Sequence, residues 1–244
     1  RDFPKAAKIR DFWALLAWLE ERLAPAWAGR ARWRLSSLEP GQLNEDALAV
    51  LGQSRLIAPH LHISLQSGSP DVLRRMGRSH YQPESLPGFL NALQRAWPVM
   101  GLGADLLMGF PGESEAEFAQ TLGLAEDLPL TYAHVFPFSP RPGTIAADLP
   151  GHLPREAAEE RAAAIRAVAA AKKENFLHFL AARRGSVLNM ILESRDTALG
   201  ISEYYASCRL TGAEIPAGLK AGLLLPVRPI RVEDGLLLVS PHAV

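Results

Sequence analysis

The stretch at residues 60–78, HLHISLQSGSPDVLRRMGR, joins a short apolar run to a helical segment. Residues 61–65 have the composition of a buried strand, and Ser69 followed by Pro70 is typical of a helix start. The same order returns at 104–118, ADLLMGFPGESEAEF, where Ser114 and Glu117 have capping-box spacing. Strands that alternate with helices predict parallel βα units, and therefore an α/β fold.

Two further apolar runs, at 33–38 and 132–136, extend this pattern to four predicted strands. Residues 154–183 are rich in Ala, Glu and Arg and contain no glycine, which predicts one long helix. After Gly185, short β-type runs are separated by Gly, Pro and Asp, as in a small all-β barrel. The sequence therefore predicts an α/β domain at 1–183 and an all-β domain at 184–244.

Composition narrows the classes of function. Lys plus Arg equals Asp plus Glu at 26 each, so bulk charge does not indicate nucleic-acid binding. Cys208 is the only cysteine, which rules out an internal disulfide and a cysteine-based cluster or zinc site within this chain. A single thiol suits a reducing compartment, so we expect a cytoplasmic location. No apolar run approaches the roughly 20 residues of a membrane helix, and we expect no membrane partner.

Polar side chains stand where the predicted strands end. Glu39 and Gln66 each follow a strand, Asp105 lies inside an apolar one, and Arg78 comes after the helix that follows Gln66. Functional groups of parallel barrels gather at these ends. Each residue also has a structural alternative: an internal salt bridge or a loop cap for Asp105, a solvated loop for Glu39 and Gln66, and helix-dipole compensation for Arg78.

Two loops after predicted strands are suited to anions. Residues 109–113, GFPGE, would expose backbone amides ahead of a helix, although a plain connecting loop needs only one glycine. Residues 139–144, SPRPGT, would hold Arg141 on a rigid turn, where it is either an anion contact or ordinary surface. His60 and His62 share a strand face, but without an obvious third ligand we interpret them as interior histidines rather than as a metal site.

In the predicted β domain, arginines accompany Tyr204 and Tyr205. Aromatic rings among cations suit single-stranded RNA, although neighbouring acids such as Glu203 and Glu233 dilute the patch. We predict RNA contacts from Arg141, Tyr204, Arg209, Arg228 and Arg231. Cys208 lies in a predicted strand and is interpreted as a buried, inert thiol.

Taken in order, RLSSLEP (34–40), HLHISLQSGSPDVLRRMGR, ADLLMGFPGESEAEF and YAHVFPFSPRPGT (132–144) resemble the radical-S-adenosylmethionine (radical SAM) tRNA methylthiotransferases. The resemblance runs from about residue 30 to the end, and GISEYYASCRL (200–210) is similar to a strand of that family's TRAM RNA-binding domain. It implies the last four strands of a (β/α) radical SAM barrel, followed by a TRAM-like barrel.

The resemblance also implies a substrate. HLHISLQSGS and HVFPFSPRPGT are most similar to the branch that acts on N6-threonylcarbamoyladenosine at position 37 of tRNA and yields its 2-methylthio derivative. Two alternatives stay open. One is the isopentenyladenosine branch, and the other is a non-catalytic RNA-binding or scaffolding protein.

Roles carry over from the family by position. The residues that match cofactor contacts of related barrels are Glu39, Gln66, Arg78 and Asp105, with Ser37 and Ser67 as second contacts to S-adenosylmethionine. An arginine suits the carboxylate of this cofactor, and acids suit its ammonium or ribose hydroxyls. The family places Arg141 toward the tRNA or the second cluster.

The family holds two 4Fe–4S clusters through cysteines that this sequence does not contain. We therefore predict no catalytic residue and no metal ligand here, an inactive chain in isolation, and a missing N-terminal half as partner beside the tRNA anticodon arm. Missing barrel strands would expose the edge at 33–38, which predicts self-association.

Overall fold

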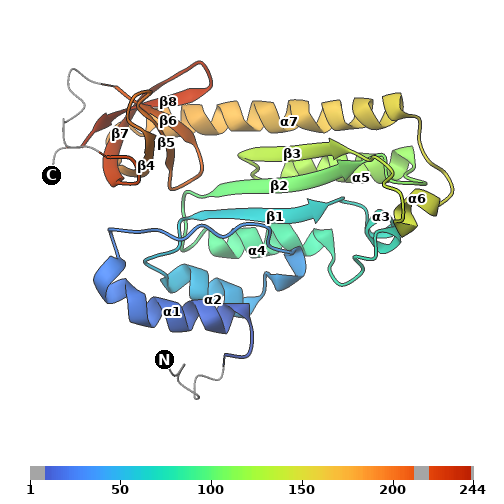
Figure 1. Ribbon diagram of the computed structural model, residues 1–244, viewed down its shortest axis with the longest axis horizontal. Helices are drawn as coiled ribbons and strands as arrows, with labels where there is room; N and C mark the ends of the chain where they lie inside the picture. The colour runs from blue at the N-terminus through green and yellow to red at the C-terminus, as the bar shows by residue number, and fades with distance from the viewer. Residues whose placement is uncertain (1–8, 212–219, 243–244) are drawn as a thin grey trace.

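The computed structural model describes residues 9–211 and 220–242. Residues 1–8 of the first predicted domain, and residues 212–219 and 243–244 of the second, lie outside the described residues. Its first part is a parallel sheet in the order β1 (His60–Gln66), β2 (Gly101–Met108) and β3 (Tyr132–Pro137) (Figure 1). The helices are α1 (Phe12–Trp27), α2 (Glu45–Gln53), α3 (Pro70–Arg75), α4 (Leu86–Leu93), α5 (Glu115–Asp127), α6 (Ile145–Asp148) and α7 (Arg155–Ala182), with single 3-10 turns at Pro40–Gln42 and Pro83–Ser85.

The helix starts agree with their sequence signals. At α5 the Ser114 side chain accepts from the backbone N–H of Glu117, and the Glu117 carboxylate accepts from the backbone N–H of Ser114 at 2.7 Å. The predicted capping box is thus confirmed. At α3, Ser69 occupies the N-cap with Pro70 in the first turn, as predicted, although its side chain makes no capping hydrogen bond.

One face of the sheet carries the core. Alternate residues of β1 and β2 point to this face and are almost fully buried, among them Leu61, Ile63, Leu102, Ala104 and Leu106. They pack with α2, α4 and the first half of α7, where Ile165 is fully buried. Each buried leucine of this kind contributes about 1.5–3 kcal/mol of transfer free energy, so this face holds the domain together.

The long helix predicted at 154–183 is confirmed as α7, and it belongs to two cores. Ala162 and Ile165 lie in the core of the sheet, while Leu177 and Leu180 lie in the core of the second part. The predicted domain boundary near residue 184 falls between α7 and the first strand that follows it.

The second part is a closed antiparallel and parallel barrel, which confirms the predicted small all-β barrel. Its strands are β4 (Leu188–Ser194), β5 (Leu199–Ser202), β6 (Ser207–Leu210), β7 (Leu224–Glu233) and β8 (Leu236–Pro241), in the order β4-β5-β6-β8-β7. Cys208 is fully buried inside it, and burial raises the pKa of its thiol to about 12. Cys208 is therefore a buried and unreactive thiol, as expected.

The prediction of a regular strand at 33–38 is wrong. This segment makes only isolated bridges, Trp33 to Ile57 and Leu38 to Ile63. Ser37 has φ 57° and is exposed like Ser36, so the backbone leaves the extended region between the two bridges and the ladder is interrupted. The self-association proposal assumed a continuous strand edge here and loses that support.

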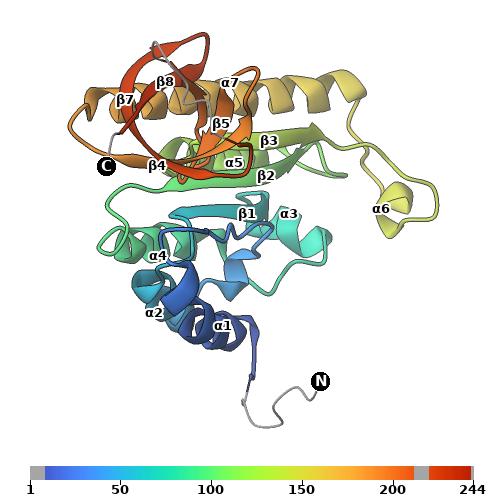
Figure 2. The same cartoon turned by 60° about the vertical axis from the view of Figure 1, so that its left-hand side comes forward.

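The barrel sits beyond the N-terminal ends of the sheet strands, whereas the arrowheads of β1–β3 point toward α3 and α6 at the opposite end (Figures 1 and 2). The close approach needs a glycine, because a Cβ on Gly101 at the start of β2 would overlap the carbonyl oxygen of Tyr204. Within the described residues, no helix combines the length and apolarity needed to cross a membrane.

Candidate functional site

The second face of the parallel sheet is polar. It presents His60, His62 and Gln66 from β1, Asp105 from β2, and Tyr132 and His134 from β3, which alternate with the buried apolar residues. Because the strands are parallel and in register, these groups form a band that runs from one end of the sheet to the other. The two ends of the band differ in structure and are described in turn.

At the C-terminal end of the strands lies a cavity of about 760 Å³. Gln66, Arg78 and Arg141 bring polar groups to its wall, and Leu107 and Phe136 are among its apolar lining residues. Gln66 has φ 62°, a conformation that costs a non-glycine residue about 1–3 kcal/mol and concentrates at functional sites. A bulge between Ile63 and Gln66 accompanies this backbone turn at the strand end.

Glu39 lies beside this cavity and forms an ion pair with Arg78, one of the arginines that line it. Its carboxylate accepts from Arg78 Nη1 at 2.5 Å and pairs with His80 Nε2 at 2.6 Å. Partial burial favours the neutral acid, but the hydrogen bonds from His80 and Arg78 outweigh it and lower the pKa of Glu39. Glu39 is therefore ionised near neutral pH and orients the Arg78 side chain at the cavity wall.

The middle of the polar face contains a hydrogen-bonded chain of side chains. The Tyr132 hydroxyl lies 3.0 Å from His60 Nε2 and 2.8 Å from His62 Nδ1. A Cβ on Gly103 would overlap the Tyr132 ring and come within 2.6 Å of His62 Nδ1, so the chain depends on a glycine in β2. Burial lowers the pKa of His60 to about 3, which keeps this imidazole neutral.

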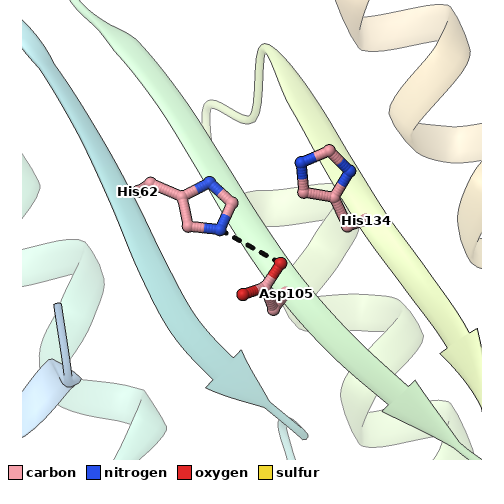
Figure 3. A group of neighbouring side chains, drawn as sticks. All are labelled: His62, Asp105 and His134. Carbon is pink, nitrogen blue, oxygen red and sulfur yellow. Dashed lines mark ion pairs between the residues drawn. The ribbon is translucent and has the colours of Figure 1, made fainter. Parts of the chain in front are cut away.

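Asp105 continues this chain toward the open side. Its Oδ1 lies 3.0 Å from His62 Nε2, and its direct partner in β3 is His134 (Figure 3). The internal pair with histidine corresponds to the structural alternative for Asp105. His62 is buried, Asp105 is partly exposed, and His134 is exposed, so solvent reaches this group of side chains from the side of His134.

The N-terminal end of the polar face is closed by the barrel. Tyr205, at φ 65° in the turn between β5 and β6, packs against the rings of His60 and Tyr132 at centroid distances of 4.9 Å. Arg34 lies over the Tyr205 ring at 4.8 Å and donates to the carbonyl oxygen of Ser202 at 3.1 Å. The two domains are thus joined at the base of the sheet.

The predicted RNA contacts fall in three places. Arg209 of β6 and Arg231 of β7 both pair with Leu238 of β8, and Arg228 pairs with Ser240, so these arginines share the outer face of β6–β8–β7. Arg141 lines the cavity at the other end of the molecule. Tyr204 is half-buried between the domains against Phe176, and burial raises its pKa to about 12, so it does not share the arginine-bearing face.

The predicted cofactor contacts also separate. Gln66 and Arg78 share the cavity and Glu39 adjoins it, while Asp105 is directed to His62. Ser37 is exposed on the turn that precedes Glu39. Ser67 is fully buried, and its hydroxyl lies 3.1 Å from that of Thr121 in α5, so the structure does not bring it to the cavity.

Sequence reasoning did not single out Tyr132 and His134 as site residues. Their spacing in YAHVF places them on one strand face, which was a usable signal. Their position opposite His62 and Asp105 depends on the strand register, which the sequence does not reveal. Arg34 was also missed, because its partner Tyr205 is 171 positions away in another domain.

Comparison with known proteins gives concordant matches. Residues 10–125 match the model of the radical SAM superfamily. The chain is 33% identical over 187 residues to the threonylcarbamoyladenosine tRNA methylthiotransferase MtaB of Thermotoga maritima, a match that covers 77% of this chain and 43% of that protein. It is 41% identical over 133 residues to the tRNA-2-methylthio-N(6)-dimethylallyladenosine synthase of Mycobacterium leprae, covering 54% of this chain and 26% of the relative.

The chain belongs to the radical SAM superfamily. Within it, the motifs and the matched relatives place the chain in the tRNA methylthiotransferase family. The matches span less than half the length of these relatives.

The cavity residues fit the cofactor that gives the superfamily its name. S-adenosylmethionine carries a carboxylate, which suits Arg78, and amino and hydroxyl groups that the Gln66 amide can bind as acceptor or donor. The apolar side chains of Leu107, Phe110 and Phe136 provide a wall for an adenine ring. An iron–sulfur cluster does not fit in the same way, because the single cysteine is buried inside the small barrel.

Proposed function

We propose that this chain is part of a tRNA methylthiotransferase and that its cavity at the C-terminal end of β1–β3 binds S-adenosylmethionine. The observation that best supports this proposal is that Gln66 and Arg78 line the same cavity, with Gln66 in a strained backbone conformation at the end of β1. Glu39 fixes Arg78 through its paired carboxylate. We leave Asp105 and Ser67 out of the proposed contacts because their side chains bind His62 and Thr121.

In this proposal the chain's own residues position the cofactor. Arg78 holds the carboxylate with a charge-assisted bond, Gln66 binds a polar group of the cofactor, and the apolar wall excludes water from it. Bound S-adenosylmethionine supplies the radical chemistry of the family. The cluster ligands come from a part of the parent protein that this chain does not contain, so the chain alone is inactive.

The proposed substrate is N6-threonylcarbamoyladenosine at position 37 of tRNA, with the 2-methylthio derivative as product. The match to the threonylcarbamoyladenosine enzyme extends over 187 residues, which supports this branch. The matches to the dimethylallyladenosine synthases have higher identity, 37–41%, over 133 residues, and they keep the isopentenyladenosine branch as the second candidate.

The barrel is proposed to act as a TRAM-like RNA-binding domain in the cytoplasm. Its support is the outer face of β6–β8–β7, where Arg209, Arg228 and Arg231 stand on adjacent strands. Lys and Arg on one surface bind phosphates whatever the sequence of the RNA. This face would contact the tRNA anticodon arm while the sheet domain holds the cofactor.

Mass spectrometry of tRNA nucleosides tests the reaction and the branch together. A strain that lacks the parent gene should lose 2-methylthio-N6-threonylcarbamoyladenosine and accumulate its unmethylthiolated precursor. The parent gene restores the modification, and the same gene with Gln66→Ala does not. Loss of the 2-methylthio isopentenyladenosine nucleoside instead assigns the second branch, and an unchanged nucleoside profile overturns the enzymatic proposal.

A further inference from the structure

The side chains in the middle of the polar face have no part in the proposed cofactor cavity. His62, Asp105 and His134 come from three neighbouring strands, and their ligand atoms all lie within 4.8 Å of one another (Figure 3). Among residues 9–211 and 220–242, this is the one group of three or more such side chains with metal-ligand spacing. We propose that it binds a first-row divalent metal ion of the zinc class.

The donor set is chemically suited to such an ion. Two imidazoles and one carboxylate are the protein ligands of many zinc sites that keep a position open, and zinc binds their N and O atoms at about 2.0–2.2 Å. Ligand atoms across one ion then lie roughly 3–4 Å apart, by the same bond lengths. His62 Nε2 and Asp105 Oδ1, at 3.0 Å, are already near that spacing. All three ligand atoms lie within 4.8 Å of one another, and the His134 ring, which completes the group, is exposed.

The fold fixes the rigid part of this group. His62 stands opposite Gly103, two residues before Asp105, and Asp105 stands directly opposite His134, so the parallel register alone brings the three together. A site on adjacent strands is held more firmly than one on loops. The ring centroids of His62 and His134 are 5.5 Å apart on the same side of the sheet.

A neighbouring hydroxyl orients the buried ligand. Tyr132 Oη binds His62 Nδ1 at 2.8 Å, which leaves Nε2 as the atom that faces Asp105 and His134. Metal-binding histidines commonly use their second nitrogen in a hydrogen bond of this kind, and loss of that partner lowers metal affinity about 10–100-fold. Tyr132 is thus a positioning residue for the proposed site.

The sequence favoured interior histidines because a third ligand was not apparent beside His60 and His62. The structure supplies two more ligands from other strands, Asp105 and His134, and His60 lies outside the group whose ligand atoms are within 4.8 Å of one another. The competing explanation is an internal pair of His62 with Asp105. That pair does not involve His134, so substitution of His134 separates the two explanations.

The proposal is tested by titrating the metal-stripped chain with Zn²⁺ in a calorimeter and with Co²⁺ by visible absorption. The wild-type chain should bind one equivalent of Zn²⁺, and His134→Gln should weaken binding at least tenfold. His178→Gln, an exposed histidine on α7, is the matched control and should bind like wild type. His134 is exposed, so thermal unfolding of its variant should match the wild type.

Tyr132→Phe tests the positioning role, with an expected loss of tenfold or more in Zn²⁺ affinity and an altered Co²⁺ spectrum. Equal binding by wild type and Tyr132→Phe overturns that role. Equal affinity of wild type and His134→Gln, or no Zn²⁺ binding by the wild-type chain, overturns the metal site itself. These readouts do not require turnover, so they are independent of the proposed methylthiotransferase activity.

Discussion

The two faces of the parallel sheet are built from the same strands, yet they follow different rules. On one face, Leu61, Leu102 and Leu106 are fully buried beneath helices. On the other, Gln66, Asp105 and His134 are partly or fully exposed; Gln66 lines the cavity and Asp105 pairs with His62. Because successive side chains of a strand point to opposite faces, the same strands can bury apolar residues on one side and present polar residues on the other.

The contrast between the two faces predicts which substitutions should affect stability and which should affect binding. Removing apolar side chains from the buried face should lower the stability of the fold strongly, whereas removing exposed polar side chains from the other face should alter binding at small cost in stability. The barrel repeats the arrangement, with Leu237 and Val239 in its core and the arginine-bearing face outside. Four predictions follow this contrast, and each has a matched control.

The largest effect is expected from neighbouring leucines of β2 that point to opposite faces. Leu106 is fully buried, so Leu106→Ala should lower the free energy of unfolding by about 2–5 kcal/mol, because a cavity remains in the core. Leu107 is only half-buried at the cavity, and Leu107→Ala should cost clearly less. Urea unfolding of both variants measures the difference, and equal losses would contradict the assignment of the two faces.

The second prediction concerns the glycine beneath the His62–Tyr132 bond. Gly103→Ala should destabilise the chain by about 1–3 kcal/mol, because the new methyl group overlaps the Tyr132 side chain. Gly88→Ala on α4 has no atom within 4 Å of the added carbon and should be neutral or stabilising by roughly 0.5–1 kcal/mol. Thermal unfolding compares the pair. A neutral Gly103→Ala would show that β2 and β3 are less closely packed here than described.

The third prediction tests the outer face of the barrel. Arg209→Ala and Arg231→Ala should each weaken tRNA binding and reduce the slope of log affinity against log salt by about one, because each arginine displaces counterions from a phosphate. Arg22→Ala on α1, whose side chain stacks on Trp18, is the control and should leave the slope unchanged. Filter binding at several salt concentrations gives both values. An unaltered slope in the barrel variants would remove this face from the RNA interface.

The smallest effect is expected at Glu39. Its pKa is below the ordinary value of 4.5, so its pairs with His80 and Arg78 stabilise the folded state above that pH, and the contribution is lost as the pH falls below it. Because the pair is partly exposed, Glu39→Gln should cost no more than about 1 kcal/mol at pH 7 and flatten the acid limb of the stability curve. The exposed Glu84→Gln should leave the curve unchanged. An identical acid limb for Glu39→Gln would contradict the pairing.

Local signals predicted much of the fold, and long-range geometry explains what they missed. The capping box at Ser114, the helix α7 and the all-β barrel follow from residue patterns within a few turns of chain. The expected strand at 33–38 failed because Ser37 takes a left-handed conformation that its sequence does not demand. Composition describes propensity, and a single residue with positive φ can override it.

The site shows the same division. Gln66 and Arg78 were predicted from their places at the end of a strand and after a helix, and the structure brings them to one cavity. Asp105 was predicted to contact the cofactor with them, but its carboxylate pairs with His62 instead. This pair forms because the register of β1 and β2 places the two side chains close together, and the sequence does not reveal that register. Tyr204 was predicted as an RNA contact, yet domain packing buries half of it against Phe176. Register and domain packing are settled by the whole chain rather than by a motif.

The most direct test of the cofactor cavity is calorimetric titration of the chain with S-adenosylmethionine. The wild type and Gln94→Ala, a change at an exposed glutamine beyond α4, should show saturable binding to one site. Gln66→Ala and Arg78→Ala should each weaken it about tenfold or more, the loss expected for a charge-assisted or buried hydrogen bond. Equal affinity in all four proteins, or no binding by the wild type, would contradict the placement of the cofactor between Gln66 and Arg78.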